Sequence, residues 1–145
     1  MINSRAINDL VPAVASRCHA FTAACHLAGV DVLITSTYRD NESQDALYAQ
    51  GRTTPGKKVT DRKGGQSIHN YMRAFDFVPL RNGKPVWGNR GEDGKLWEKC
   101  GIIGEACGLS WSGRWKGRSA EMAHMQYLGG MTLEMLQADK GEVRK

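Results

Sequence analysis

Apolar side chains recur every three or four positions between residues 10 and 28, with polar side chains between them. This spacing predicts an amphipathic helix that buries one face. Asn8 or Asp9 can cap its start. Pro12 is tolerated in the first turn, and Gly29 can end the helix. The apolar face consists of Leu10, Val14, Cys18, Phe21, Cys25 and Ala28.

A second stripe with the same period predicts a helix over about residues 93–107. Two shorter helices are expected as well. One runs from a cap at Asp40 or Asn41 to Tyr48, and the other begins at Thr132. The apolar face of the long helix consists of Leu96, Cys100, Ile103 and Cys107.

Segments of a different pattern lie between these helices and predict strands. Residues 30–38 (VDVLITSTY) are rich in β-branched side chains, and residues 122–127 alternate between two faces. The Asn82-Gly83 pair is typical of a hairpin turn. Because helices and strands mix without a β-α-β rhythm, the sequence predicts an α+β fold with a small antiparallel sheet flanked by helices. The predicted strands cover residues 30–38, 74–80, 85–87, 109–111 and 122–127.

The composition is that of a folded domain. The chain has 145 residues, which favours one domain spanning residues 1–145. A hydrophobic fraction of 41% and a charged fraction of 24% exclude a disordered chain. No apolar run approaches the roughly 20 residues of a membrane span. Residues 1–10 lack the apolar core and cleavage site of a signal peptide, so we expect synthesis in the cytoplasm without one.

The charge is basic, with 20 Lys and Arg against 15 Asp and Glu and a net charge of +5. Two basic loops are expected, over residues 52–66 and 113–119, and the charged tail 139–145 is expected to fray. Their cations can attract an anionic cell envelope, although a solvated loop explains any one of them equally well. Basic charge also suggests a nucleic-acid binder, but no recognised nucleic-acid motif is present, so we expect no nucleic-acid partner. The loop cations are Lys57, Lys58, Arg62, Lys63, Arg114, Lys116 and Arg118.

The four cysteines fall into two pairs, each seven residues apart, without a Cys-x-x-Cys motif. Seven helical residues rise about 10.5 Å. A disulfide needs Cα atoms within about 7 Å, so neither pair can close within its own helix. Four reduced, half-buried thiols are the favoured interpretation, and a disulfide between the two helices is the alternative. The cysteines are Cys18, Cys25, Cys100 and Cys107.

Two of the four histidines are candidates for chemistry. His19 and His26 lie seven residues apart on one predicted helix, too far to share a metal ion. His69 and His124 remain, and Asp76 lies on a predicted strand. Two imidazoles and one carboxylate make a three-ligand zinc site with a fourth position free for water, which is the catalytic arrangement.

A carboxylate for proton transfer lies close to this set, because Glu121 precedes His124 by three residues. The alternative is that each histidine is a hydrogen-bonded surface residue and that the His-x₆-Asp spacing arises by chance. Spacing alone leaves both interpretations open.

Residues 67–76 (SIHNYMRAFD) resemble the Ser-x-His-x-x-Gly-x-Ala-x-Asp motif of peptidase family M15, the zinc D-Ala-D-Ala carboxypeptidases and related peptidoglycan peptidases. The resemblance covers about residues 30–128: STYR, LYAQGRT and PG lie upstream, and GLSWSGRW and Glu121-x-x-His124 lie downstream. The size most resembles phage endolysins that are L-alanyl-D-glutamate peptidases. One departure is Met72, where the family usually has a glycine that serves close backbone approach or a positive φ angle.

The resemblance implies one zinc ion (Zn2+) per chain, bound by His69, Asp76 and His124. It also implies that Glu121 is the base that takes a proton from water. Arg39 aligns with the arginine that stabilises the developing oxyanion, an electrostatic contribution worth roughly 2.7–4 kcal/mol per donor.

Three further residues are assigned to substrate binding through the resemblance: Ser67, Gln44 and Trp111. Ser67 fits a loop cap equally well. Gln44 fits a role in orienting Arg39, or a helix surface. Trp111 and Trp115 fit either the walls of a peptide cleft or the packing of the core.

The implied fold is of the Hedgehog and DD-peptidase type. The implied protein is a monomeric zinc endopeptidase that cuts the L-alanyl-D-glutamate bond of bacterial peptidoglycan during phage-induced host lysis. Such an enzyme is made in the host bacterial cytoplasm and needs a holin-like membrane protein to reach the cell wall in the periplasm. The alternatives are a D-alanyl-D-alanine carboxypeptidase and a non-catalytic cell-wall-binding module. Glu121 argues against the latter, because loss of the base is the simplest route to a dead enzyme.

Overall fold

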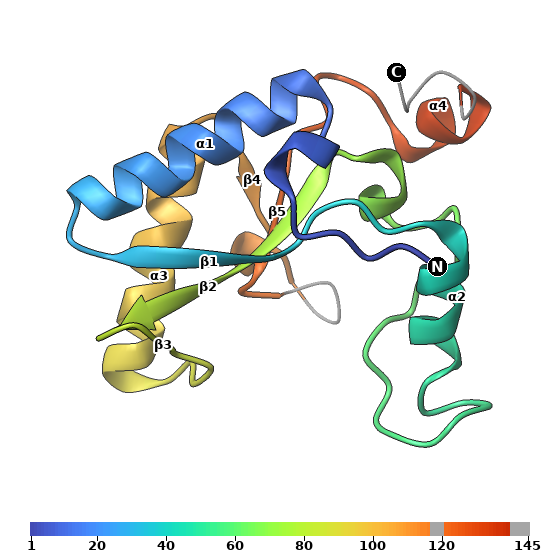
Figure 1. Cartoon of the computed structure of the whole chain (residues 1–145), viewed down its shortest axis with the longest axis horizontal. Helices are drawn as coiled ribbons and strands as arrows, with labels where there is room; N and C mark the ends of the chain where they lie inside the picture. Colours follow the sequence, from blue (N-terminus) through green and yellow to red (C-terminus); the bar gives the residue numbers. More distant parts are fainter. Residues whose placement is uncertain (117–120, 140–145) are drawn as a thin grey trace.

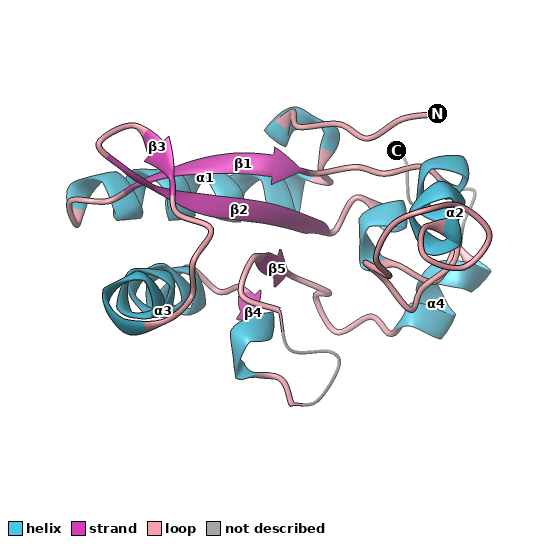
Figure 2. Cartoon of the chain, turned by 90° about the horizontal axis from the view of Figure 1, so that it is seen from below, coloured by secondary structure: helices cyan, strands magenta, loops and turns pink. Residues whose placement is uncertain are grey.

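The computed structural model describes residues 1–116 and 121–139, which form one antiparallel sheet with helices around it (Figure 1). The strand order is β1-β2-β5-β4, and β3 pairs with the end of β2 (Figure 2). This arrangement confirms the predicted α+β class with a small antiparallel sheet. The strands are β1 (Asp31–Ser36), β2 (Ala74–Arg81), β3 (Lys84–Pro85), β4 (Ser110–Trp111) and β5 (His124–Gln126).

The helices of the described residues divide into two groups. Figure 1 shows α1 and α3 beside the long strands β1 and β2, whereas α2 and α4 lie beyond one end of these strands. Among these helices none is long and apolar enough to cross a membrane. The α-helices are α1 (Pro12–Leu27), α2 (Asn41–Ala49), α3 (Gly91–Ala106) and α4 (Leu133–Ala138), and the 3-10 turns are η1 (Ile7–Asp9), η2 (Ile68–Tyr71) and η3 (Ser112–Arg114).

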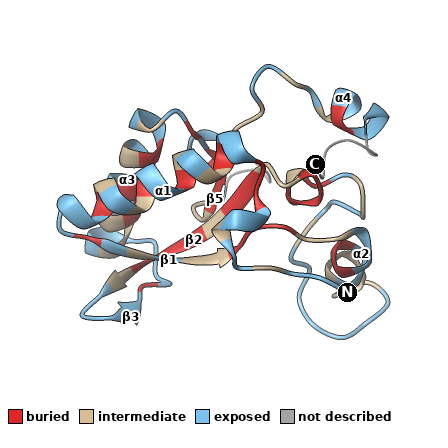
Figure 3. Ribbon diagram, turned by 45° about the horizontal axis from the view of Figure 1, so that its top comes forward, coloured by how far each residue is buried: buried red, intermediate tan, exposed pale blue. Residues whose placement is uncertain are grey.

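The core lies between one face of the sheet and the two long helices (Figure 3). The ring of Phe77 on β2 packs 5.1 Å from Phe21 of α1 and 5.2 Å from Trp97 of α3, between ring centroids. Because one side chain touches both helices, α1 and α3 cover the same face. Successive strand residues point to opposite faces, so Asp76 projects from the other face of β2.

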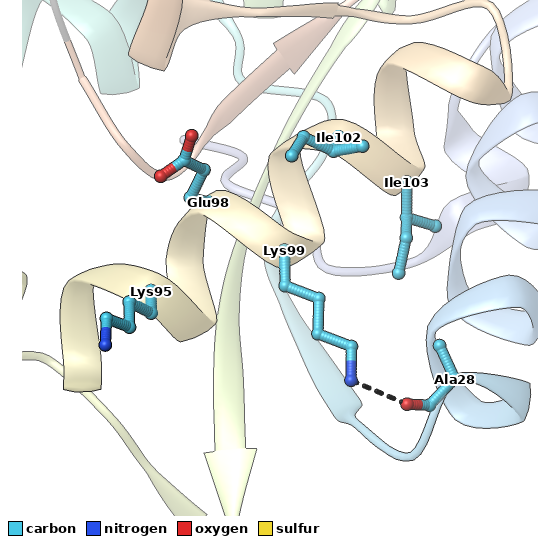
Figure 4. Close-up of a pocket in the computed structure, with 6 residues that line it drawn as sticks. All are labelled: Ala28, Lys95, Glu98, Lys99, Ile102 and Ile103. Atoms are coloured by element: carbon cyan, nitrogen blue, oxygen red, sulfur yellow. Dashed lines mark hydrogen bonds between the residues drawn. The ribbon is translucent and has the colours of Figure 1, made fainter.

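Two glycines of α3 let the helix approach the sheet closely. A Cβ atom at Gly101 would lie 2.3 Å from the ring of Trp111, and one at Gly104 would lie 2.3 Å from Cε of Met125. On the outer side of the same helices, Lys99 donates from Nζ to the carbonyl oxygen of Ala28 at 2.8 Å and ties α3 to the end of α1 (Figure 4).

The predicted helix caps are partly correct. Asp40 and Thr132 cap α2 and α4 through their side-chain oxygens, as predicted. The predicted cap of α1 at Asn8 or Asp9 is wrong, because both residues lie in η1 and no side chain caps α1. The helix begins at Pro12 instead, and the absence of its N–H removes one of the donors that a cap would satisfy.

The predicted hairpin is present, but its second strand is shorter than expected. Asn82 and Gly83 have φ angles of 54° and 77°, as a tight two-residue hairpin turn requires. The returning strand covers Lys84–Pro85 and not residues 85–87, and Trp87 is exposed beyond it.

All four cysteines carry free thiols, as the favoured interpretation predicted, and they do not form a disulfide between the two helices. Three are fully buried, namely Cys18, Cys25 and Cys100, while Cys107 is half-buried. Burial raises the pKa of Cys18 to about 12. These thiols act as small core residues at the contact between α1 and α3.

Candidate metal centre and active site

Three side chains from separate segments meet beside the first residues of β2. His69 Nε2 lies 3.2 Å from Asp76 Oδ1, and His124 Nδ1 lies 3.5 Å from the same oxygen. Each residue offers one ligand atom, and these atoms all lie within 4.8 Å of one another. The side chains are only 4%, 17% and 11% exposed, so all three are largely shielded from solvent.

Secondary structure holds each of these groups in place. The antiparallel register sets Asp76 of β2 opposite His124 of β5, and opposed residues project from the same face. His69 comes from η2, immediately before β2. The turn begins with a capping box, in which Ser67 accepts from the N–H of His69 (3.3 Å) and Asn70 accepts from the N–H of Ser67 (3.1 Å).

The backbone conformation at the end of η2 explains why the family motif has a glycine at the position of Met72. Met72 has φ 61° and ψ 30°, in the left-handed region that glycine enters freely. For another residue this conformation costs roughly 1–2 kcal/mol. The Met72 side chain nevertheless packs against the hydrophobic core. The departure from the motif therefore leaves the turn in the shape that glycine would give it.

Both imidazoles are hydrogen-bonded on the side that faces away from the triad. His69 Nδ1 lies 2.8 Å from the carbonyl oxygen of Thr37, which can only accept, so Nδ1 carries the proton. His124 Nε2 lies 2.8 Å from Oε1 of Gln126. These contacts leave His69 Nε2 and His124 Nδ1 directed at Asp76, where each nitrogen donates to the carboxylate when its ring is protonated and offers a lone pair to a metal when its ring is neutral.

Electrostatics keep the carboxylate of the triad ionised. Burial alone would raise the pKa of Asp76, but the two imidazoles and their hydrogen bonds outweigh burial and hold that pKa well below its usual range. Burial likewise tends to lower the pKa of His124, but its hydrogen bond to Asp76 outweighs burial and raises it. An ionised carboxylate with two oriented imidazoles is the donor set of a catalytic zinc site, so these residues fit that metal.

Arg39 points its guanidinium at the triad. Its Nη2 lies 3.7 Å from Asp76 Oδ2 and donates to Ser36 Oγ at 3.1 Å. Its Nη1 donates to Gln44 Oε1 at 2.9 Å, while its Nε is buried without a partner among the described residues. The side chain is only 11% exposed. Arg39 is therefore a fixed cation beside the metal site.

The N-terminal segment braces the same region. Residues 2–6 pair with residues 37–40: Asn3 forms an antiparallel bridge with Arg39, and Ile2 accepts from the N–H of Asp40 at 3.0 Å. The segment thus lies along the stretch that supplies the Thr37 carbonyl and the guanidinium (Figure 1).

Glu121 lies on the approach to β5, within electrostatic reach of the whole site. The residue is exposed, yet burial of its carboxyl group raises its pKa, and the charge of Asp76 raises it further. His124, His69 and Arg39 act in the opposite direction. A carboxyl group with a raised pKa beside a metal site is suited to carry a proton between water and a leaving group.

The comparisons with known proteins agree with this geometry. Residues 60–127 match the family model of D-alanyl-D-alanine carboxypeptidases within peptidase family M15. The chain is 38% identical over 128 residues to the peptidoglycan L-alanyl-D-glutamate endopeptidase CwlK of Bacillus subtilis (strain 168), across 83% of this chain and 75% of that protein. The chain belongs to peptidase family M15. Its candidate metal site is accordingly that of a metallopeptidase.

Solved structures share the fold of this M15 peptidase at lower identity. The Serratia marcescens L-Ala D-Glu endopeptidase ChiX is 15% identical with a TM-score of 0.61, over 88% of this chain and 89% of that one. The LD-carboxypeptidase LdcB is 17% identical with a TM-score of 0.62, over 90% and 64%. DacB from Streptococcus pneumoniae D39 is 22% identical with a TM-score of 0.60, over 92% and 71%.

The three residues that the resemblance assigned to substrate binding are all buried in the structure. Ser67 is buried and caps η2, which was its alternative interpretation. Gln44 is 1% exposed and is fixed between Arg39 and the carbonyl oxygen of Arg62. Trp111 is 4% exposed in the core, and its Nε1 donates to the carbonyl oxygen of Met122. All three side chains are thus buried, and their assignment to substrate binding stays a prediction.

The exposed aromatic ring beside the metal site is Trp115. Its ring centroid lies 5.6 Å from that of His124, and the residue is 37% exposed. Of the two tryptophans that fit a cleft wall, the structure assigns Trp111 to the core and leaves Trp115 beside the site.

The basic loops are partly tied into the structure. Arg62 donates to the carbonyl oxygen of Gln66, and Arg114 pairs with Glu105, so these cations brace the fold. Lys57, Lys58 and Lys63 remain exposed on the loop at residues 52–66. Arg118 and residues 140–145 of the charged tail lie outside the described residues.

The sequence did not indicate two groups that support the ligands, Thr37 and Gln126. Thr37 contributes a backbone carbonyl, for which no residue type is diagnostic. Gln126 had a signal, because it follows His124 by two positions on a predicted strand and therefore shares its face.

Proposed function

We propose that this M15 peptidase is a zinc-dependent endopeptidase that cleaves the L-alanyl-D-glutamate bond of peptidoglycan stem peptides. The observation that carries the proposal is the convergence of His69, Asp76 and His124 with Arg39 at their edge. The substrate is inferred from CwlK, the relative at 38% identity that acts on that bond.

His69, Asp76 and His124 would hold the metal. A zinc ion bound there supplies a Lewis acid and lowers the pKa of a bound water to about 7. The protein must then move the proton of the attacking water. Glu121 is assigned this step, because its raised pKa allows it to take a proton at Oε and pass it to the leaving amine.

Arg39 is assigned to the charge that develops on the scissile carbonyl oxygen. Its guanidinium is fixed before substrate arrives, so it needs no reorganisation as the charge grows. Its Nη2 faces the metal site, 3.7 Å from Asp76 Oδ2, and is the donor assigned to the oxyanion. Loss of one such donor typically costs about 10²–10³-fold in kcat.

The second candidate is a D-alanyl-D-alanine carboxypeptidase, which the description of the matching family model favours. The same groups would perform the same hydrolysis on the terminal D-Ala. The two activities differ in their products, because an endopeptidase creates a new N-terminal D-Glu, whereas a carboxypeptidase releases free D-Ala.

Digestion of purified Gram-negative-type peptidoglycan separates the candidates. Mass spectrometry of the soluble products is expected to show stem peptides with N-terminal D-Glu, together with a fall in turbidity of the wall suspension. Glu121→Gln protein serves as the matched control. Free D-Ala without new D-Glu termini or loss of turbidity would select the carboxypeptidase and reject the endopeptidase.

We further propose a role in host lysis, in which the protein is made in the bacterial cytoplasm and reaches the periplasmic wall through a holin-like membrane protein. The support is the resemblance of its motifs and size to phage endolysins. The test is expression in bacteria with and without a holin. Lysis is expected only when both proteins are present, and lysis without the holin would reject that requirement.

We also propose that the protein is a monomer. Light scattering is expected to report a mass of 16.0 kDa.

A further inference from the structure

The second histidine of the triad depends on a side chain that no motif contains. Gln126 follows His124 on β5, and its Oε1 lies 2.8 Å from Nε2 of that imidazole. His69 has the equivalent contact from a backbone carbonyl, that of Thr37. One ligand is therefore oriented by the main chain and the other by a replaceable amide.

The sheet fixes the position of this amide. Gln126 pairs with Ala74 on β2 and with Ser110 on β4, so its backbone is held on both sides. Because residues two apart on a strand share a face, the Gln126 and His124 side chains project side by side. The opposed residue on β2 is the small Ala74, which is fully buried and leaves room for the amide.

The orientation of the amide decides which nitrogen binds metal. A neutral imidazole carries its proton on one nitrogen and a lone pair on the other. With Oε1 of Gln126 as acceptor, the proton resides on Nε2, and the lone pair of Nδ1 faces Asp76. Without the acceptor, Asp76 Oδ1 attracts the proton to Nδ1, which removes the lone pair that a metal needs.

We propose that Gln126 is a positioning residue that holds His124 in its metal-binding tautomer. The inference rests on the proposed metal site, but it concerns the protein before metal binds. Partners that orient a ligating histidine typically contribute about 10–100-fold in metal affinity, and this is the effect assigned to Gln126.

The test compares Gln126→Leu, which removes the acceptor at similar size, with Gln126→Glu, which keeps it. The first measurement is ¹H–¹⁵N correlation of the imidazole nitrogens in metal-free protein, followed with rising pH until the spectrum no longer changes. The wild-type protein and Gln126→Glu are expected to carry the His124 proton on Nε2. Gln126→Leu is expected to shift it toward Nδ1.

The second measurement is zinc affinity by competition with a chelator. Gln126→Leu is expected to bind zinc about 10–100-fold more weakly, and Gln126→Glu is expected to retain wild-type affinity or exceed it. Gln137→Leu is the matched control, because this glutamine lies on α4 and its hydrogen bond runs from Nε2 to the Gly65 carbonyl oxygen. An unchanged tautomer with unchanged affinity in folded Gln126→Leu would overturn the proposal. If wild-type protein binds no zinc, the proposed function fails, while the tautomer of the metal-free protein still decides the role of Gln126.

Discussion

Gln44 holds the guanidinium of Arg39 through a 2.9 Å hydrogen bond from inside the protein, where the glutamine is 1% exposed. Orientation of Arg39 was one of the roles that the sequence left open for Gln44, and this contact is the one that forms. The arrangement separates two contributions to catalysis: the charge of Arg39 and its orientation. Both can be tested without altering the three candidate ligands.

Arg39→Ala is expected to lower kcat by about 10²–10³-fold, because it removes the donors for the oxyanion. Gln44→Leu is expected to lower kcat by a smaller factor, because the cation remains but loses one of its two hydrogen bonds. Zinc content is expected to stay normal in both variants. Steady-state kinetics on a soluble stem peptide measures these effects, and a kcat in Arg39→Ala equal to that of the wild type would remove Arg39 from the mechanism.

Metal content provides the most direct check of the candidate site. Protein purified without added metal is expected to contain one zinc ion per chain by elemental analysis. Alanine at His69, Asp76 or His124 is expected to reduce this toward zero, because three ligands are the minimum of the proposed arrangement. His19→Ala is the control and is expected to keep its zinc. Full occupancy in the double variant His69→Ala, His124→Ala would refute the assignment.

Glu121→Gln is expected to retain the fold and the zinc but to lose about 10²–10⁴-fold in turnover, since the amide cannot accept the proton. In the wild-type enzyme the base must be ionised, so kcat/KM falls as pH drops through the pKa of Glu121. Because burial raises that pKa, the acid limb is expected above the usual range of a glutamate. If the acid limb of kcat/KM lies at or below the usual pKa range of a glutamate, the titrating group is not Glu121.

Packing of α3 on the sheet predicts that alanine is tolerated less well at Gly101 than at Gly104. Gly101→Ala is expected to destabilise the fold by about 1–3 kcal/mol, because the added Cβ meets the rigid ring of Trp111 at 2.3 Å. This exceeds the gain in helix propensity of about 1 kcal/mol. Gly104→Ala is expected to cost less, because the atoms in its way are Cε and Sδ of flexible Met125. Urea unfolding of both variants measures the difference, and equal stabilities would contradict the packing argument.

Thiol labelling tests the burial of the cysteines. In native protein at about pH 8, only the half-buried Cys107 is expected to react readily with an aromatic disulfide reagent. The other three are fully buried, and the pKa of Cys18 is raised to about 12, so they are expected to react only on unfolding. Rapid reaction of four thiols in the native state would contradict this core.

The sequence predicts the fold well where periodicity is strong. The stripe of α1, the β-branched run of β1 and the Asn82-Gly83 turn each depend on local chemistry, and all three elements form. The start of α1 was missed because Pro12 makes a side-chain cap unnecessary. The second hairpin strand was too long in the prediction because strand ends depend on pairing partners that are distant in sequence.

For the site, too, features set by local chemistry were predicted better than features set by distant partners. The three candidate ligands were identified because imidazoles and carboxylates are few and chemically distinctive. Residues that support them were placed less well, since a buried glutamine or tryptophan looks the same in the sequence whether it faces substrate or core. Gln44 and Trp111 are the two examples, and only tertiary packing separates these cases.

The pairing of residues 2–6 with residues 37–40 has a practical consequence for the preparation of the enzyme. The N–H of Ile2 donates to Oδ2 of Asp40 at 2.9 Å, and Asp40 is the residue that caps α2 and directly follows Arg39. An affinity tag joined ahead of Met1 brings foreign sequence beside Asp40 and the guanidinium of Arg39. Kinetic constants measured with an uncleaved N-terminal tag would therefore combine the properties of the enzyme with those of the tag.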